Sequence, residues 1–199
     1  YTVSAHRPET NEMDIDFVLH EHSGPASSWA RTAKLGETLS IAGPGAKKLV
    51  DQDADWLFIV GDMTALPAIC ASLRILPASA RGYVVLEVIE TRDIQDLQLP
   101  PSVELHWVVN PAASSTENPL LKKVESLPWL DGSPDVWAAC EFSTMRSLRK
   151  YFKVTRQIDK DSLYVSSYWK KGIDESRHKR VKREDSNQEE ALEGISTER

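Results

Sequence analysis

The sequence has only two cysteines, Cys70 and Cys140, which excludes a disulfide framework and a four-cysteine metal site. Both lie among apolar residues, so we expect buried free thiols in a reducing compartment, the cytoplasm. The five histidines form no spacing with each other or with acidic residues that is typical of metal ligands. We therefore expect no bound metal ion.

Long apolar runs are also missing, and none approaches the roughly 20 residues that a membrane-spanning helix needs. The start of the chain has no basic and apolar signal segment. Tyr1 instead lies inside a strand-like stretch, so we expect a fragment of a longer chain. The 199 residues, 41% hydrophobic and 27% charged, are typical of a globular protein with a real core.

Common catalytic and nucleotide-binding motifs are absent as well. There is no Ser-His-Asp arrangement and no Gly-x-Ser-x-Gly motif, so a serine hydrolase is not indicated. The Gly-Pro-Gly sequence at 43–45 lacks the third glycine and the apolar helix of a dinucleotide fingerprint.

Charge is unevenly distributed along the chain, whose net charge is -6. Residues 170–183 hold seven basic and two acidic residues, whereas 184–199 hold six acidic residues and one arginine. This pattern predicts a charged extension over 170–199, with a helix over 173–183 and disorder over 184–199. The basic run at 177–183 could bind nucleic acid or an acidic surface, but a solvated helix face is favoured, and we expect no nucleic-acid partner.

Periodicity divides the rest of the chain near residue 52. Residues 1–52 show a strand at 14–20, a short helix after Gly24 and a strand at 35–42, consistent with antiparallel strands. Residues 53–169 alternate short apolar strands with amphipathic helices, which predicts an α/β domain with a mostly parallel, Rossmann-like sheet. The strands are expected at 56–60, 83–89, 104–109, 135–139 and 163–168, and the helices at 66–76, at 118–127 and after a Ser143 cap.

In such a sheet, ligands bind beyond the carboxyl ends of the strands. The segments expected there are Gly61-Asp62-Met63-Thr64, Glu90, Asn110 and Cys140-Glu141. In the first unit, small residues at 24–28 open a helix whose free N–H groups suit an anion. These residues could also serve only to shape turns and face solvent.

Seven segments in order make the chain resemble the siderophore-interacting protein family, flavin-dependent ferric-siderophore reductases of the ferredoxin-reductase-like superfamily. They are Tyr1-Thr2-Val3, Asp14–His20, Gly24–Ala30, Gly43-Pro44, Gly61–Ile69, Trp137–Glu141 and Tyr164–Gly172. The resemblance implies that 1–52 are the C-terminal part of an antiparallel flavin-binding β-barrel. It implies that 53–169 bind NAD(P)H. Met63 and Cys140 depart from the family pattern on the pyridine-nucleotide side.

The resemblance also implies roles for individual residues. Those assigned to FAD are Tyr1, Thr2, Val3, Asp16, Val18, His20, Gly24, Ala26, Ser27, Thr64, Ala65, Tyr168 and Trp169. Those facing the nicotinamide donor are Gly61, Asp62, Glu90 and Glu141.

The implied chemistry belongs largely to the cofactor, which mediates between a two-electron donor and one-electron reduction of Fe(III), so no catalytic side chain is expected. The implied electron donor is NAD(P)H, with ferredoxin as another candidate, and the substrate is a ferric siderophore that releases Fe(II). Because that substrate is bulky and often anionic, basic side chains should bind it. The candidates are Lys170 and Lys171, and more weakly Lys47 and Lys48. The alternative is a non-catalytic fragment that binds a nucleotide or a partner without flavin.

Overall fold

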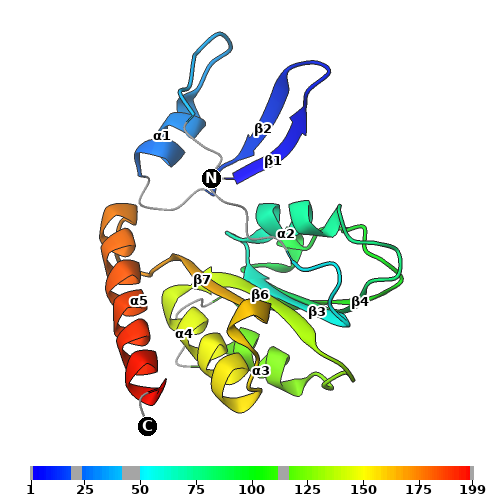
Figure 1. Ribbon diagram of the computed structural model, residues 1–199. Helices are drawn as coiled ribbons and strands as arrows, with labels where there is room; N and C mark the ends of the chain where they lie inside the picture. The colour runs from blue at the N-terminus through cyan, green and yellow to red at the C-terminus, as the bar shows by residue number, and fades with distance from the viewer. Residues whose placement is uncertain (1, 19–23, 42–49, 112–116, 198–199) are drawn as a thin grey trace.

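The computed structural model describes residues 2–18, 24–41, 50–111 and 117–197. Two sheets stand one above the other: a small antiparallel sheet near the N-terminus and a larger parallel sheet below it (Figure 1). This α/β architecture is the fold class that the sequence predicts. None of the helices among the described residues is long and apolar enough to cross a bilayer.

The small sheet consists of β1 (Thr2–Arg7) and β2 (Glu12–Asp16), which pair antiparallel. It is followed by α1 (Pro25–Thr32), which begins at the glycine- and serine-rich turn as expected. The predicted strand at 14–20 thus ends earlier, at Asp16.

The predicted strand at 35–42 is wrong for its described part. Residues 35–41 form a turn and extended coil in which Leu35, Leu39 and Ile41 are exposed. Apolar alternation makes a strand only where another strand can pair with it. Within the described ranges, β1 and β2 pair only with each other.

The large sheet has five parallel strands in the order β5-β4-β3-β6-β7, which confirms the predicted parallel sheet. Its strands are β3 (Trp56–Asp62), β4 (Arg81–Val88), β5 (Ser102–Val109), β6 (Pro134–Glu141) and β7 (Leu163–Trp169). The central strand β3 is buried along its whole length, as strands covered on both faces are.

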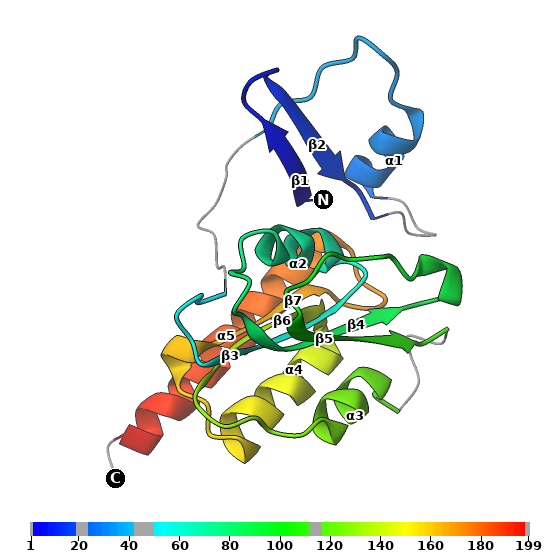
Figure 2. The same ribbon diagram turned by 90° about the vertical axis from the view of Figure 1, so that its right-hand side faces the viewer.

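Helices cover both faces of this sheet (Figure 2). Helix α2 (Leu66–Leu73) packs on one face, and α3 (Pro119–Ser126) and α4 (Phe142–Lys150) pack on the other. Because β3 side chains alternate, Leu57 joins the α2 side of the core and Phe58 the α3–α4 side. Shorter turns of 3-10 or π type lie at Thr91–Asp93, Tyr151–Thr155 and Lys160–Ser162.

The predicted cap of α4 and the predicted burial of Cys70 are both corrected. Glu141, not Ser143, caps α4: its carboxylate accepts the N–H groups of Ser143 (2.5 Å) and Thr144 (3.3 Å). Ser143 lies two residues beyond the cap position, inside the helix. Cys140 is buried, but Cys70 is only half-buried because it borders a cavity.

The expected disorder over 184–199 is wrong for its described part, because α5 (Glu175–Thr197) continues through residues 184–197. The helix runs along β7 and α4 (Figure 1). Asp185 and Glu189 approach Arg149 of α4 to 2.5 Å each, and Glu189 also pairs with Lys153 at 2.9 Å. The sequence pattern missed this docking because it is carried by charge pairs rather than an apolar stripe.

Polar contacts also bind the first half of α5 to β7. His178 is 6% exposed and hydrogen-bonds with Ser167 Oγ at 2.8 Å. Lys182 donates to Ser166 Oγ at 2.6 Å and to the Ser167 carbonyl at 3.0 Å. The basic run at 177–183 is therefore partly a packing face, not only a solvated one.

This packing predicts acid sensitivity. Burial and the charges of Lys182 and Lys170 lower the pKa of His178, and the opposing charges of Glu175 and Glu141 do not reverse this. The unfolded chain therefore binds a proton at His178 at a higher pH than the folded protein does. Stability is lost as pH falls below the ordinary histidine pKa of 6.5.

Replacing His178 by glutamine should flatten this loss. The measurement is urea unfolding at a series of pH values on both sides of 6.5. The matched control is glutamine at His6, which is exposed on β1. Equal pH profiles for the wild type and the His178 variant would contradict the prediction.

Candidate functional site

A cavity of about 540 Å³ lies between the small sheet and the carboxyl edge of the large sheet. The first unit contributes Asp16, Phe17 and Val18 to its wall. The ends of β3 and β7 contribute Asp62 and Trp169. The cavity thus occupies the edge where open parallel sheets bind ligands, and it is shared by both units.

Asp62 is the most connected side chain at this edge. It is 7% exposed, and its Oδ1 accepts both the N–H (2.9 Å) and the hydroxyl (2.5 Å) of Thr64. Its Oδ2 accepts the N–H of Glu141 at 2.9 Å and the indole N–H of Trp169 at 2.7 Å. One carboxylate therefore joins the ends of β3, β6 and β7 to the turn before α2.

Burial raises the pKa of Asp62, and these hydrogen bonds oppose the rise. Burial also raises the pKa of Glu87, whose Oε2 accepts the Asn110 amide at 3.0 Å. Both Glu87 and Asn110 line the cavity. This wall therefore places the Glu87 carboxyl and the Asn110 amide where a ligand could form hydrogen bonds with them.

A hydrogen bond between the end of α2 and strand β1 joins the two units beside the cavity. Arg74, at the end of α2, donates to the Ser4 carbonyl of β1. The Ser4 hydroxyl donates to Asp16 Oδ1 at 3.0 Å. Helix α2 thus supports both the cavity floor and the strand that faces it.

The start of α1 has the features of an anion site. Gly24 occupies the cap position and offers no side chain to the first turn, which contains no acidic residue. Ser27 is buried and donates its hydroxyl to the Gly24 carbonyl at 3.1 Å. Within the described part of the chain no side chain caps this helix, so its first N–H groups could bind a ligand.

Two predicted donor-facing acids are engaged within the protein. Glu141 caps α4 and also accepts the Lys171 N–H at 3.3 Å. Glu90 caps the turn at Thr91–Asp93, pairs with Arg92 at 2.9 Å and does not border the cavity. That both acids face a donor stays a prediction.

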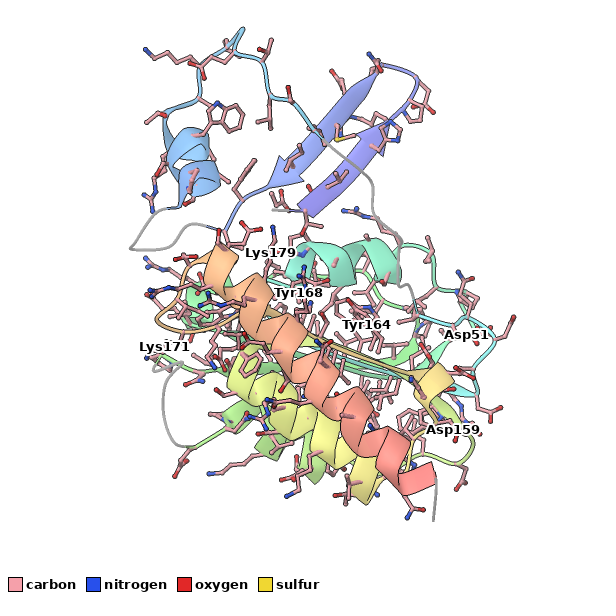
Figure 3. The ribbon with its side chains drawn as sticks, turned by 60° about the vertical axis from the view of Figure 1, so that its left-hand side comes forward. Asp51, Asp159, Tyr164, Tyr168, Lys171 and Lys179 are labelled. Carbon is pink, nitrogen blue, oxygen red and sulfur yellow. The ribbon has the colours of Figure 1, made fainter. Side chains whose placement is uncertain are left out.

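The lysines that follow β7 lie beside Glu141 rather than in the cavity. The Lys170 ammonium is 4.0 Å from the Phe142 ring centroid, a cation–π contact. Lys171 is exposed and points outward (Figure 3). Lys170 also borders a groove of about 870 Å³ between α4 and α5.

Comparison with known proteins places this geometry in a family. Residues 54–172 match the siderophore-interacting protein model, and residues 1–48 match the siderophore-interacting FAD-binding domain model. The chain belongs to the siderophore-interacting protein family. This confirms the resemblance drawn from the seven sequence segments. The boundary near residue 52 stays a prediction.

Individual relatives support the same family assignment for this siderophore-interacting chain. It is 35% identical over 180 residues to a ferric vibriobactin reductase of Vibrio cholerae, covering 89% of the chain and 66% of that protein. It is 30% identical to a ferric acinetobactin reductase of Acinetobacter baumannii, covering 88% of the chain and 62% of that protein. The chain thus spans about two thirds of these relatives. The siderophore-interacting protein SipS of Aeromonas hydrophila matches with a TM-score of 0.83 and 36% identity, covering 93% of the chain and 73% of that structure.

The structure brings together only part of the residue set that the family resemblance implies. Asp16, Val18, Asp62, Thr64 and Trp169 line one cavity. Thr2 and Val3 lie on β1, and Gly24, Ala26 and Ser27 at the start of α1. Tyr1, His20, Lys47 and Lys48 lie outside the described residues.

Three residues of that set serve the core. Ala65 is fully buried against α2, and Tyr168 packs on Trp137 and beside Tyr164 under the same helix (Figure 3). Gly61 gives α2 room: a Cβ there would lie 2.9 Å from that of Ala65. Sequence order alone could not separate these packing roles from ligand contact.

The cavity residues that sequence reasoning missed include Ser4, Phe17, Arg74 and Glu87. Glu87 carried a usable signal, since a carboxylate inside a strand buried on both faces calls for a special reason. Arg74 carried none, because its cavity position depends on how the two units pack. Among the described residues, no group of three or more His, Cys, Asp or Glu side chains could hold a metal ion.

Proposed function

We propose that this chain is the larger part of a flavin-dependent ferric-siderophore reductase. Electrons pass from NAD(P)H through FAD to a ferric siderophore, which releases iron as Fe(II). The observation that carries the proposal is the cavity shared by the small sheet and the carboxyl edge of the large sheet. The matching FAD-binding and siderophore-interacting models support it. The cytoplasm is the proposed location, consistent with the two free thiols.

The residues present fit FAD. The cavity is of the size that ring-shaped cofactors occupy, and Phe17, Val18 and Trp169 give it apolar walls. The polar atoms of Thr64 and Glu87 offer hydrogen bonds within it. The N-terminus of α1 would hold the pyrophosphate. FAD, when bound, supplies the ability to accept two electrons together and to donate them singly.

The protein's own part is binding, orientation and exclusion of water. Asp16 and Thr64 approach the cavity from opposite units, so a bound ring would be held between them. Trp169 and Phe17 shield it from solvent. No side chain needs to transfer a proton for iron reduction itself, so we assign no catalytic residue.

The test is a titration with FAD and FMN, followed by anaerobic addition of NADH or NADPH. We expect tight FAD binding, weaker FMN binding because FMN lacks the pyrophosphate, and loss of the visible flavin absorbance with one of the two donors. A folded protein that binds neither flavin would favour the alternative, a non-catalytic module.

The lysines after β7 provide a prediction about substrate. Replacing both Lys170 and Lys171 by glutamate should raise the apparent KM for an anionic ferric siderophore about tenfold at low salt, since two attractions become two repulsions. Flavin reduction by the donor should stay unchanged. The readout is steady-state Fe(II) formation. The matched control replaces two lysines that lie elsewhere, Lys122 and Lys160, by glutamate. If flavin reduction fell and KM did not move, the pair would belong to the donor site.

A further inference from the structure

The indole of Trp169 reaches the cavity through an irregularity of β7. The pairing of β6 with β7 is regular up to Cys140 and Ser167, and then shifts so that Glu141 pairs with Trp169. Such a bulge re-aims the side chain that follows it. Trp169 is consequently turned into the cavity wall instead of continuing the strand's alternation. Strand β7 ends at Trp169, so the strand pairing does not continue beyond this residue to help fix the position of its indole.

The hydrogen bond that fixes the ring runs from its N–H to Asp62 Oδ2, at 2.7 Å. Asp62 is itself immobile, because it ends the fully buried strand β3 and receives three further bonds from Thr64 and Glu141. A hydrogen bond to a charged, rigid acceptor is strong and directional. The orientation of Trp169 is therefore set by Asp62.

A carboxylate has about four lone-pair positions, and all four on Asp62 are used by the protein's own donors. A ligand hydroxyl or amide could bond to Asp62 only by displacing one of them. This differs from the role that the family resemblance implies, contact with a nicotinamide donor.

We propose that Asp62 is a positioning residue, which holds Trp169 as a wall of the cavity and acts on the bound flavin through that indole. The part that concerns flavin rests on the proposed function. The part that concerns the indole does not, and it is testable in the protein without any ligand.

The first test is NMR of the indole N–H groups in the ligand-free protein. The Trp169 signal is assigned by its loss in Trp169→Phe. We expect it to lie downfield of the other five indole signals and to exchange slowly with solvent. In Asp62→Asn it should move upfield and exchange at least tenfold faster, because the charged acceptor is gone.

Asp135→Asn is the matched control. Asp135 is 9% exposed, lies at the opposite end of the sheet in β6 and accepts one backbone N–H, from Asp51 at 2.9 Å. The Asp135→Asn variant should leave the Trp169 indole signal at its wild-type position. If both aspartate variants moved the signal equally, or neither did, the proposed tether would be overturned. If Asp62→Asn fails to fold, the wild type decides by itself: fast exchange of its Trp169 indole N–H with solvent would overturn the proposed tether.

The second test is a double-mutant cycle on FAD affinity. Asp62→Asn and Trp169→Phe should each weaken binding about tenfold, and the double variant no more than the weaker-binding single variant, because both act through one contact. Effects that multiply would show that Asp62 acts on flavin without the indole and would overturn the proposal. Absence of FAD binding in the wild type would instead contradict the proposed function, leaving the NMR result to decide on the tether.

Discussion

Replacing Gly24 by aspartate is expected to weaken FAD binding by about 10- to 100-fold while leaving the fold intact. The added carboxylate would stand at the α1 N-terminus, where the pyrophosphate is proposed to bind, so two negative charges would compete for the same N–H groups. A repulsion of about 1.4 to 2.7 kcal/mol corresponds to that loss.

This position suits the experiment because no strain accompanies the change. Gly24 has an ordinary φ of -75°, and a Cβ added there would meet nothing within 4 Å. Aspartate is moreover a good helix cap, so α1 should be no less stable. Gly24→Asn is the matched control, since it caps equally well without the charge and should keep most of the affinity. FAD affinity is measured by fluorescence titration. Equal affinity in the two variants would show that the pyrophosphate does not bind at this helix.

Reversing Arg149 to glutamate should release α5. Arg149 is only 18% exposed and is the shared partner of Asp185 and Glu189, so the change would gather three carboxylates at one place. We expect the free energy of unfolding to fall by about 2 to 3 kcal/mol, between the values for surface and buried pairs. We also expect rapid trypsin cleavage within residues 177–183, a region that should resist in the wild type.

Lys150→Glu supplies the control, because the neighbouring Lys150 is exposed. It should change stability by less than about 0.5 kcal/mol and leave trypsin resistance unchanged. The sequence pattern predicts instead that 184–199 is disordered. Equal trypsin sensitivity of wild type and Arg149→Glu would restore that view and contradict the docking described above.

The parallel sheet could be predicted because its determinants are local. Apolar runs such as 56–60 and 135–139 are too short for helices and too apolar for exposed strands, which leaves a strand covered on both faces. The helix predicted over 118–127 is likewise local, and the structure places it at Pro119–Ser126 with Asn118 as its cap.

What could not be predicted depends on contacts between distant segments. The second half of α5 looks polar and unstructured in sequence, yet Asp185 meets Arg149 across 36 residues. Asp62 looks like one more acid at a strand end, and only the fold shows that Trp169, 107 residues away, donates to its Oδ2. Residues 35–41 carried a strand-like pattern that paired with nothing among the described residues.

The most direct measurement of the central claim is anaerobic stopped-flow oxidation of the donor-reduced, FAD-loaded protein by a ferric siderophore. The matched reagent is the same siderophore loaded with Ga(III), which has nearly the size and charge of Fe(III) but cannot accept an electron. The account predicts that the ferric complex restores the visible flavin absorbance with formation of Fe(II), and that the gallium complex restores nothing and inhibits by occupying the site. Unchanged reduced flavin in the presence of the ferric complex would contradict it.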